Sequence, residues 1–267
     1  MNEIVVSKES FFNIDKYALI ISNIEFLNAL FEVYLTSNEV SQDGLRSYYV
    51  DYYLVQMKNG GFSQFVYNSK WNEDVIDYVR TGLAAMGATE NLALFEKLSN
   101  QLDNLELSQL QTFLNSDYWG ESLERDLISS FDDDFFALQE SENLIYFNHH
   151  WLLNHKNLVV LEEEEWDERI KMAKNANKEF ESRQKAALDA QPRYANLIRK
   201  LCEAANQELE KITAGDPSHK YNGQQILAWH FITDQGHHFM VELVDEVIMF
   251  NSKTNNVVAQ IRVGSSL

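Results

Sequence analysis

Apolar side chains recur every three or four positions through the first part of the chain. Ile20, Ile24, Leu27 and Phe31 form one such series within residues 9–37. This spacing places side chains on one face of a helix, so it predicts amphipathic helices. The pattern continues to about position 155, and no clear strand alternation precedes position 158 apart from short apolar runs.

Residues typical of helix ends divide this region into separate helices. The second helix is expected to begin near Ser41 and to end at Gly60–Gly61, because glycine adopts the left-handed conformations that terminate helices. Asn72 is expected to cap the next helix and Gly87 to end it. Thr89 is then expected to cap the helix that follows.

The following segment, residues 162–190, lacks glycine and proline and is rich in helix-forming residues, which predicts one long connecting helix. Pro192 is expected to begin another helix that runs to about Thr213. The pattern then changes to a period of two, which is typical of strands. We therefore expect a small antiparallel sheet of three or four strands between Gln224 and Val263.

Together these patterns predict an α+β fold with three parts. Residues 1–160 are expected to form an acidic, all-helical domain. Residues 161–214 form a helical connector. Residues 215–267 form a small antiparallel β-sheet region.

The charge of the chain is strongly uneven. Asp and Glu outnumber Lys and Arg by 41 to 22, and residues 1–165 contain 28 acidic and only 9 basic side chains. The remaining residues have equal numbers of each. Such an acidic first part disfavours direct binding to nucleic acid or to an anionic membrane, and it favours basic protein partners.

Cysteine content and the N-terminal sequence bear on location. The single Cys202 excludes an intramolecular disulfide and any CxxC motif. The N-terminal sequence lacks the pattern of a signal peptide, and no stretch is apolar over the length of a membrane span. We therefore expect a cytoplasmic protein.

Candidate catalytic chemistry is sparse. None of the common phosphate-binding, hydrolase or zinc-protease motifs occurs. His230, His237 and His238 are the best candidates for a metal site, but His230 and His238 share a sheet face only if Thr233 pairs with His237. A two-residue turn would place them on opposite faces. We expect no metal, no other cofactor and no enzymatic activity, with a metal-dependent enzyme using these histidines as an alternative.

A distinctive sequence, YYVDYYLVQMKNGGFSQFVYNS, covers residues 48–69. It predicts an aromatic-rich helix, a turn whose Asn and Gly residues can adopt positive φ, and a second helix capped by Ser63. The glutamine after this cap could bond to backbone groups freed at the turn. A structural role is expected for the residues of the turn, which are Asn59, Gly60, Gly61, Phe62 and Gln64.

The Asn-Gly-Gly-Phe-Xaa-Gln string and the Tyr-rich helix before it resemble the signature of the neisserial DNA-mimic protein family. The sequence FDDDFFAL at residues 131–138 is similar to the acidic and aromatic late segment of that family. The resemblance covers roughly residues 15–157. It implies an all-helical domain that presents carboxylates in place of DNA phosphates and occupies a DNA-binding transcription factor. The chain adds about 100 residues to the short family form.

Imitation of DNA needs rows of closely spaced carboxylates on a rigid scaffold. Asp117, Glu121 and Glu124 have the spacing i, i+4, i+7 and would share a face if residues 117–124 were helical. For each cluster taken alone, solvation of a helix is the simpler interpretation. The candidate partner-binding residues are Asp117, Glu121, Glu124, Asp132, Asp133 and Asp134.

The leading hypothesis is a non-enzymatic inhibitor that imitates DNA charge and blocks a basic DNA-binding protein or a toxin. An immunity protein that neutralises one cognate bacterial toxin is an alternative, and the sequence also allows a homodimer. A structural role in a larger assembly is a further alternative, with the predicted helix over Trp166–Ala190 as the docking face.

Overall fold

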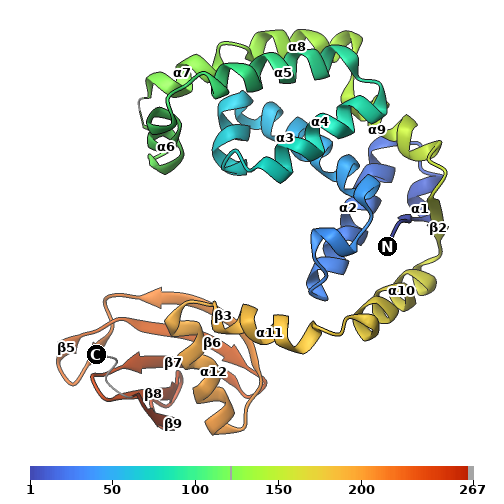
Figure 1. The fold of residues 1–267 in the computed structure, drawn as a ribbon. Coiled ribbons are helices and arrows are strands. Elements are labelled where there is room, and N and C mark those ends of the chain that lie inside the picture. Colours follow the sequence, from blue (N-terminus) through green and yellow to red (C-terminus); the bar gives the residue numbers. More distant parts are fainter. Residues whose placement is uncertain (121, 264–267) are drawn as a thin grey trace. The chain divides into compact units, whose positions relative to one another are not determined.

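The computed structural model describes residues 1–120 and 122–263. It divides the chain into two compact units, Met1–Phe180 and Glu181–Leu267. Helices make up most of the first unit, and a five-stranded antiparallel sheet forms the second (Figure 1). The predicted α+β class is therefore confirmed. Within the described ranges, no helix is long and apolar enough to cross a membrane.

The first unit is a set of helices with one short pair of strands. In chain order its elements are β1 (Ile4–Ser7), α1 (Lys8–Phe11), α2 (Lys16–Glu32), the 3-10 helix η1 (Ser37–Glu39), α3 (Gln42–Ser69), α4 (Glu73–Met86), α5 (Thr89–Asp103), α6 (Leu107–Asn115), α7 (Leu123–Ser129), α8 (Asp132–Ser141), α9 (Leu144–Leu153), β2 (Leu158–Leu161) and α10 (Glu163–Ala176).

Helix α3 lies at the centre of this unit and contacts α2, α4 and α9 (Figure 1). Its aromatic side chains build the main core, in which Tyr53, Phe62, Phe65 and Phe95 are fully buried. The rings of Phe65 and Phe95 both meet Tyr53 edge to face, with centroids 5.1 and 5.3 Å away. Such aromatic pairs stabilise a core beyond the area that they bury.

Both predicted ends of α4 are confirmed, and the predicted cap of α5 is wrong. The side chain of Asn72 accepts hydrogen bonds from the first amides of α4, and Gly87 ends that helix with a φ of 74°. Thr89, however, is the first residue of α5 and not its cap. The residue in the cap position is Ala88, whose side chain cannot accept a hydrogen bond.

A parallel pair of strands joins the start of the first unit to the segment after α9. Ile4 of β1 pairs with Leu158 of β2, and the pairing continues to Ser7 and Leu161. Strand β1 was not predicted, because four residues are too few to show a periodic pattern. Its residues Ile4 and Val6 are completely buried against α2 and α9.

The predicted long helix over residues 162–190 is wrong. The segment forms α10 and the separate helix α11 (Phe180–Asp189), with a break that begins at Asn177. The side-chain amide of Asn177 donates hydrogen bonds to the carbonyl oxygens of Val33 and Tyr34 at 3.0 and 3.2 Å. This contact satisfies carbonyls at the end of α2, and the local sequence gives no sign of it.

The docking face proposed for Trp166–Ala190 therefore does not exist as one continuous helix. Trp166 also packs inward, with its ring centroid 4.9 Å from that of Phe26. The segment predicted as a connector, 161–214, is divided between the units, because α10 belongs to the first and α12 to the second.

The second unit is a five-stranded sheet with helices and a small hairpin. After α11, its elements are α12 (Arg193–Ala205), β3 (Leu209–Asp216), β4 (Lys220–Tyr221), β5 (Gln224–Gln225), β6 (Ala228–Thr233), β7 (Gly236–Glu242), β8 (Glu246–Asn251) and β9 (Val257–Arg262). The strand order of the sheet is β3-β6-β7-β8-β9. Helix α12 ends at Ala205 rather than near Thr213, because Asn206 takes a left-handed conformation.

The two faces of this sheet are covered differently. Leu197 and Leu201 of α12 pack on one face against Phe231 and Met249. The opposite face packs against the loop of β4 and β5, where Tyr221 is among the partners. The sheet therefore has its own core on both sides.

One carboxylate lies in the interior of the first unit without full hydrogen bonding. Asp51 of α3 is 6% exposed, and the Tyr17 hydroxyl donates to its Oδ2 at 3.3 Å. Its Oδ1 has no partner among the described residues. Burial raises the pKa of Asp51 to about 6, although the Tyr17 hydrogen bond and the charge of Lys58 oppose the shift.

A raised pKa means that the folded protein resists ionisation of Asp51, so this group should cost stability as the pH rises from 4 through 6. The free energy of unfolding of Asp51→Asn, relative to that of the wild type, should rise by about 2–3 kcal/mol between pH 4 and pH 7.5. Urea unfolding across this range measures the difference. Asp133→Asn, at an exposed site, is the control and should follow the wild type; parallel curves for Asp51→Asn would contradict the prediction.

Candidate protein-binding surface

The Asn-Gly-Gly-Phe sequence interrupts helix α3. Gly60 has φ −162° and ψ 23°, and Gly61 has φ 72° and ψ −170°, so the helix breaks and starts again at Phe62. The predicted helix–turn–helix is therefore present inside one long element. Of the three turn residues for which positive φ was allowed, Gly61 alone adopts it, and Asn59 stays helical.

Asp132 caps the second half of α3 from another helix. The backbone N–H of Phe62 donates to Asp132 Oδ1 at 2.8 Å. A side chain on Gly61 would clash with this carboxylate, since its Cβ would lie 2.0 Å from Asp132 Oδ2. Burial raises the pKa of Asp132, and the Phe62 hydrogen bond opposes the shift. Asp132 is therefore part of the scaffold, which sequence reasoning missed because Phe62 is 70 residues away.

The other turn residues also serve the scaffold. Ser63, predicted as the cap, donates to the Gly60 carbonyl at 3.4 Å, and the Tyr118 hydroxyl donates to the same oxygen at 3.3 Å. Gln64 bonds to the side chain of Gln56 at 2.9 Å and not to the backbone. The ring of Phe62 is buried in the aromatic core.

The acidic residue that directly follows α8, Glu142, caps α5. Glu142 follows the last residue of α8 and is only 6% exposed. It accepts hydrogen bonds from the backbone N–H groups of Glu90 and Asn91 at 3.2 and 2.6 Å and from the Asn91 side chain at 2.7 Å. These are the first amides of α5, whose own cap residue, Ala88, cannot bond to them.

The predicted row of Asp117, Glu121 and Glu124 does not lie on one helix. Asp117 lies in the turn after α6, where its Oδ1 accepts from the Trp119 N–H at 3.2 Å. Glu124 lies in the first turn of α7, and the Ser122 hydroxyl donates to its Oε2 at 2.9 Å. Glu121 lies outside the described residues. The helical condition for a shared face is therefore not met.

Asp133 and Asp134 do face solvent. Both are exposed in the first turn of α8, where carboxylates interact favourably with the helix dipole. Lys97 Nζ lies 3.6 Å from Asp134 Oδ2, with both side chains 60% exposed. Pairs at such exposed sites contribute little to stability. Asp133 and Asp134 are thus available to a partner.

We use the name ridge for helices α6, α7 and α8 and the turn between α6 and α7. Helices α7 and α8 follow each other along the edge of the unit, beside α5 (Figure 1). Exposed acids occur just before α6, in the turn after it, and along α7 and α8, whereas α6 itself contains none. They are Glu106, Asp117, Asp126, Asp133, Asp134 and Glu140.

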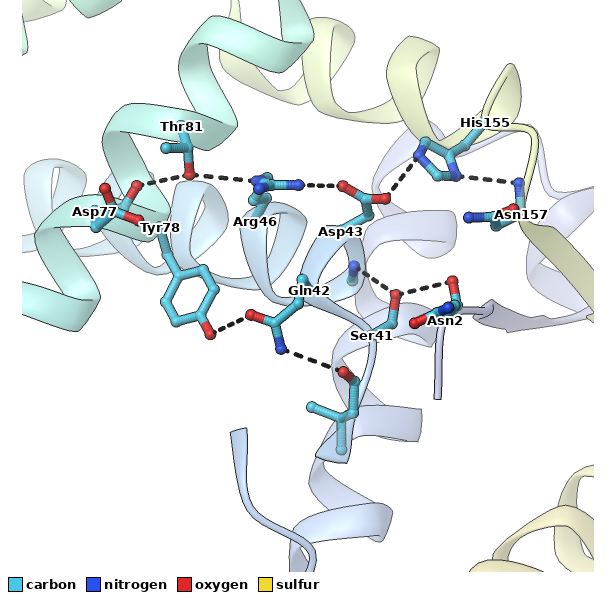
Figure 2. Close-up of polar contacts among 12 residues, drawn as sticks. Asn2, Ser41, Gln42, Asp43, Arg46, Asp77, Tyr78, Thr81, His155 and Asn157 are labelled. Atoms are coloured by element: carbon cyan, nitrogen blue, oxygen red, sulfur yellow. Dashed lines mark hydrogen bonds and ion pairs between the residues drawn. The ribbon is translucent and has the colours of Figure 1, made fainter. Parts of the chain in front are cut away.

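A polar network connects α3, α4 and the segment after α9 (Figure 2). Arg46 forms an ion pair with Asp43, and its Nε donates to Thr81 Oγ1 at 3.3 Å. His155 Nε2 lies 3.3 Å from Asp43 Oδ2. The N–H of Asn157 donates to His155 Nδ1 at 3.3 Å. Both ring nitrogens of His155 therefore have partners within this network.

The C-terminal histidines do not converge. Thr233 pairs with Gly236, so the turn has two residues and His238 pairs with Phe231 while His230 pairs with Phe239. His230 and His238 consequently lie on opposite faces of the sheet, and His238 is 1% exposed. No cluster of three or more potential metal ligands occurs in the described part of the chain.

The negative charge is concentrated in the first unit. Residues 1–180 contain 31 acidic and 13 basic side chains, whereas residues 181–267 contain 10 and 9. Of the 30 acidic residues of the first unit that the structure describes, 22 are exposed. Because the unit has 31 acids and only 13 bases, more than half of its acids cannot each have a separate basic partner within it.

Residues 38–155 match the family model of DMP19-like proteins, a DNA-mimic family. The match covers 118 of the 267 residues and includes α3 to α9, and thus the broken helix, its Asp132 cap and the ridge. The resemblance inferred from the motif is therefore confirmed for this segment. Comparisons with curated proteins and with solved structures gave no significant match.

Gly61→Ala should destabilise the first unit strongly. Alanine at this position must adopt a strained positive φ, and its methyl group displaces the Asp132 carboxylate. We expect a loss of about 3 kcal/mol in the free energy of unfolding. Gly60→Ala is the matched control, since its Cβ would meet the movable end of the Gln64 side chain. It should cost less than about 1 kcal/mol by urea titration. Equal losses would show that Asp132 does not require an empty Gly61 position.

Proposed function

We propose that the first unit is an acidic protein-binding domain that occupies the nucleic-acid-binding surface of a basic protein and thereby inhibits it. The observation that carries this proposal is the exposure of 22 acidic residues on a unit with a net charge of −18. Similarity to a DNA-mimic family supports the same class of function. It also favours a non-enzymatic role, because such proteins act by binding.

Within the unit, we place the contact surface on the ridge. The ridge lies inside the segment that matches the family, whereas the acidic first turn of α10 lies outside it. Helix α8 is fixed at both ends, by Asp132 to α3 and by Glu142 to α5. Asp133 and Asp134 are therefore held on a rigid helix while their carboxylates face solvent, which a phosphate mimic needs.

The class of the partner distinguishes two forms of this proposal. A transcription factor would be released from its operator, and a toxin nuclease would lose its activity. The second form corresponds to an immunity protein. It is supported by the second unit, which is nearly neutral, has its own core and lies outside the family match, so it could add specificity for one toxin.

Neutralising the ridge should weaken partner binding. We expect the triple variant Asp133→Asn, Asp134→Asn, Glu140→Gln to bind a basic partner about tenfold more weakly, with a reduced dependence on salt. The partner is captured at low salt from a nuclease-treated extract and purified, and its affinity is measured by calorimetry. Duplex DNA added to the complex should displace the acidic protein.

The control variant removes the same charge elsewhere, as Glu163→Gln, Glu164→Gln, Glu168→Gln on the exposed face of α10. It should lose no more than about twofold in affinity through long-range effects. Equal losses in the two variants would show that net charge alone drives binding. A partner that binds DNA and this protein simultaneously would contradict mimicry.

A further inference from the structure

A groove on the first unit differs in character from the rest of its surface. It has a volume of about 570 Å³ and lies between the start of α2, the end of α4 and the outer face of α9. Helix α9 contributes Tyr146, His149, His150 and Leu153, which follow the spacing i, i+3, i+4, i+7 and so share one face. The volume is in the range of pockets that bind small molecules.

The walls of the groove are mainly apolar. Met86 closes one side, and Tyr146 and Leu153 remain 54% and 40% exposed along the groove. Large apolar side chains that remain exposed together on a folded unit are typical of binding sites. These walls could bury the apolar body of a ligand.

Apart from the phenol of Tyr146, the titratable side chains in the groove are all basic. Lys16, His149 and His150 line it, and no Asp or Glu does. In a unit where acids outnumber bases by 31 to 13, this is a local reversal of charge. Lys16 Nζ lies 4.0 Å from the centroid of the Tyr146 ring, so the cation is held over an aromatic wall.

His149 is affected by its burial and by the two other basic groups. Burial lowers the pKa of His149, and the charges of Lys16 and His150 lower it further. Lys16 therefore supplies the fixed positive charge of the groove, which a bound anion would neutralise. A neutral ligand would gain only the apolar contacts.

We propose that this groove binds a small organic anion with an apolar body, such as an aliphatic carboxylate. The carboxylate pairs with Lys16, and the aliphatic body lies between Tyr146, Met86 and Leu153. This site shares no residue with the acidic ridge. Its ligand is an anion, whereas the partner proposed for the ridge is basic. Its chemistry does not depend on the identity of the protein partner.

Calorimetric titration of the full chain with octanoate tests the site, with octanol as the uncharged ligand of the same length. We expect saturable 1:1 binding of octanoate and weaker binding of octanol. Lys16→Gln should weaken octanoate binding about tenfold and leave octanol unchanged. Lys171→Gln, an exposed lysine on α10, is the matched control and should bind as the wild type.

Several results would overturn the proposal. They are the absence of saturable octanoate binding, equal binding of octanol, or equal effects of Lys16→Gln and Lys171→Gln. A stable dimer by light scattering that dissociates in Tyr146→Ala would assign the groove to a second copy of the chain instead. None of these results bears on the ridge, whose partner binding is measured separately.

Discussion

The first unit depends on two carboxylates that cap helices other than their own. A helix that starts without a suitable cap leaves backbone N–H groups unsatisfied, and this costs stability when they are buried. The second half of α3 and the start of α5 both lack such a residue, and Asp132 and Glu142 bond to their amides. Because these acids lie at the two ends of α8, the helix braces α3 and α5 together.

The Gly-Gly-Phe motif and the acidic helix α8 therefore depend on each other structurally. Gly61 provides the positive φ that breaks α3, and its missing side chain leaves the space that the Asp132 carboxylate fills. Phe62 then anchors the restarted helix in the aromatic core. An apolar motif can thus be necessary for an acidic surface without being part of it, since the brace fixes the direction in which Asp133 and Asp134 point.

Local sequence signals predicted the parts of the fold that depend on near neighbours. Asn72 and Gly87 act within a turn of their own helix, so α4 was found with its ends. Strand β1 and the break at Asn177 depend on distant partners, at β2 and at the end of α2, and local patterns could not reveal them. Charge counting located the acidic unit, but it could not separate the capping role of Asp132 from the exposed Asp133.

The distribution of charge also argues against solubility as the sole reason for the acidic excess. Solubility requires net charge but no particular placement, yet the second unit is nearly neutral and the α9 groove is lined by basic side chains. The proposed attraction of a basic partner to the ridge would act over about 10 Å at 0.1 M salt and would weaken as salt rises. Proposed binding in the groove combines one short-range charge pair at Lys16 with apolar burial, and salt weakens only the first of these. The two surfaces share no residue, so substitutions on the ridge and at Lys16 separate their contributions within the same molecule.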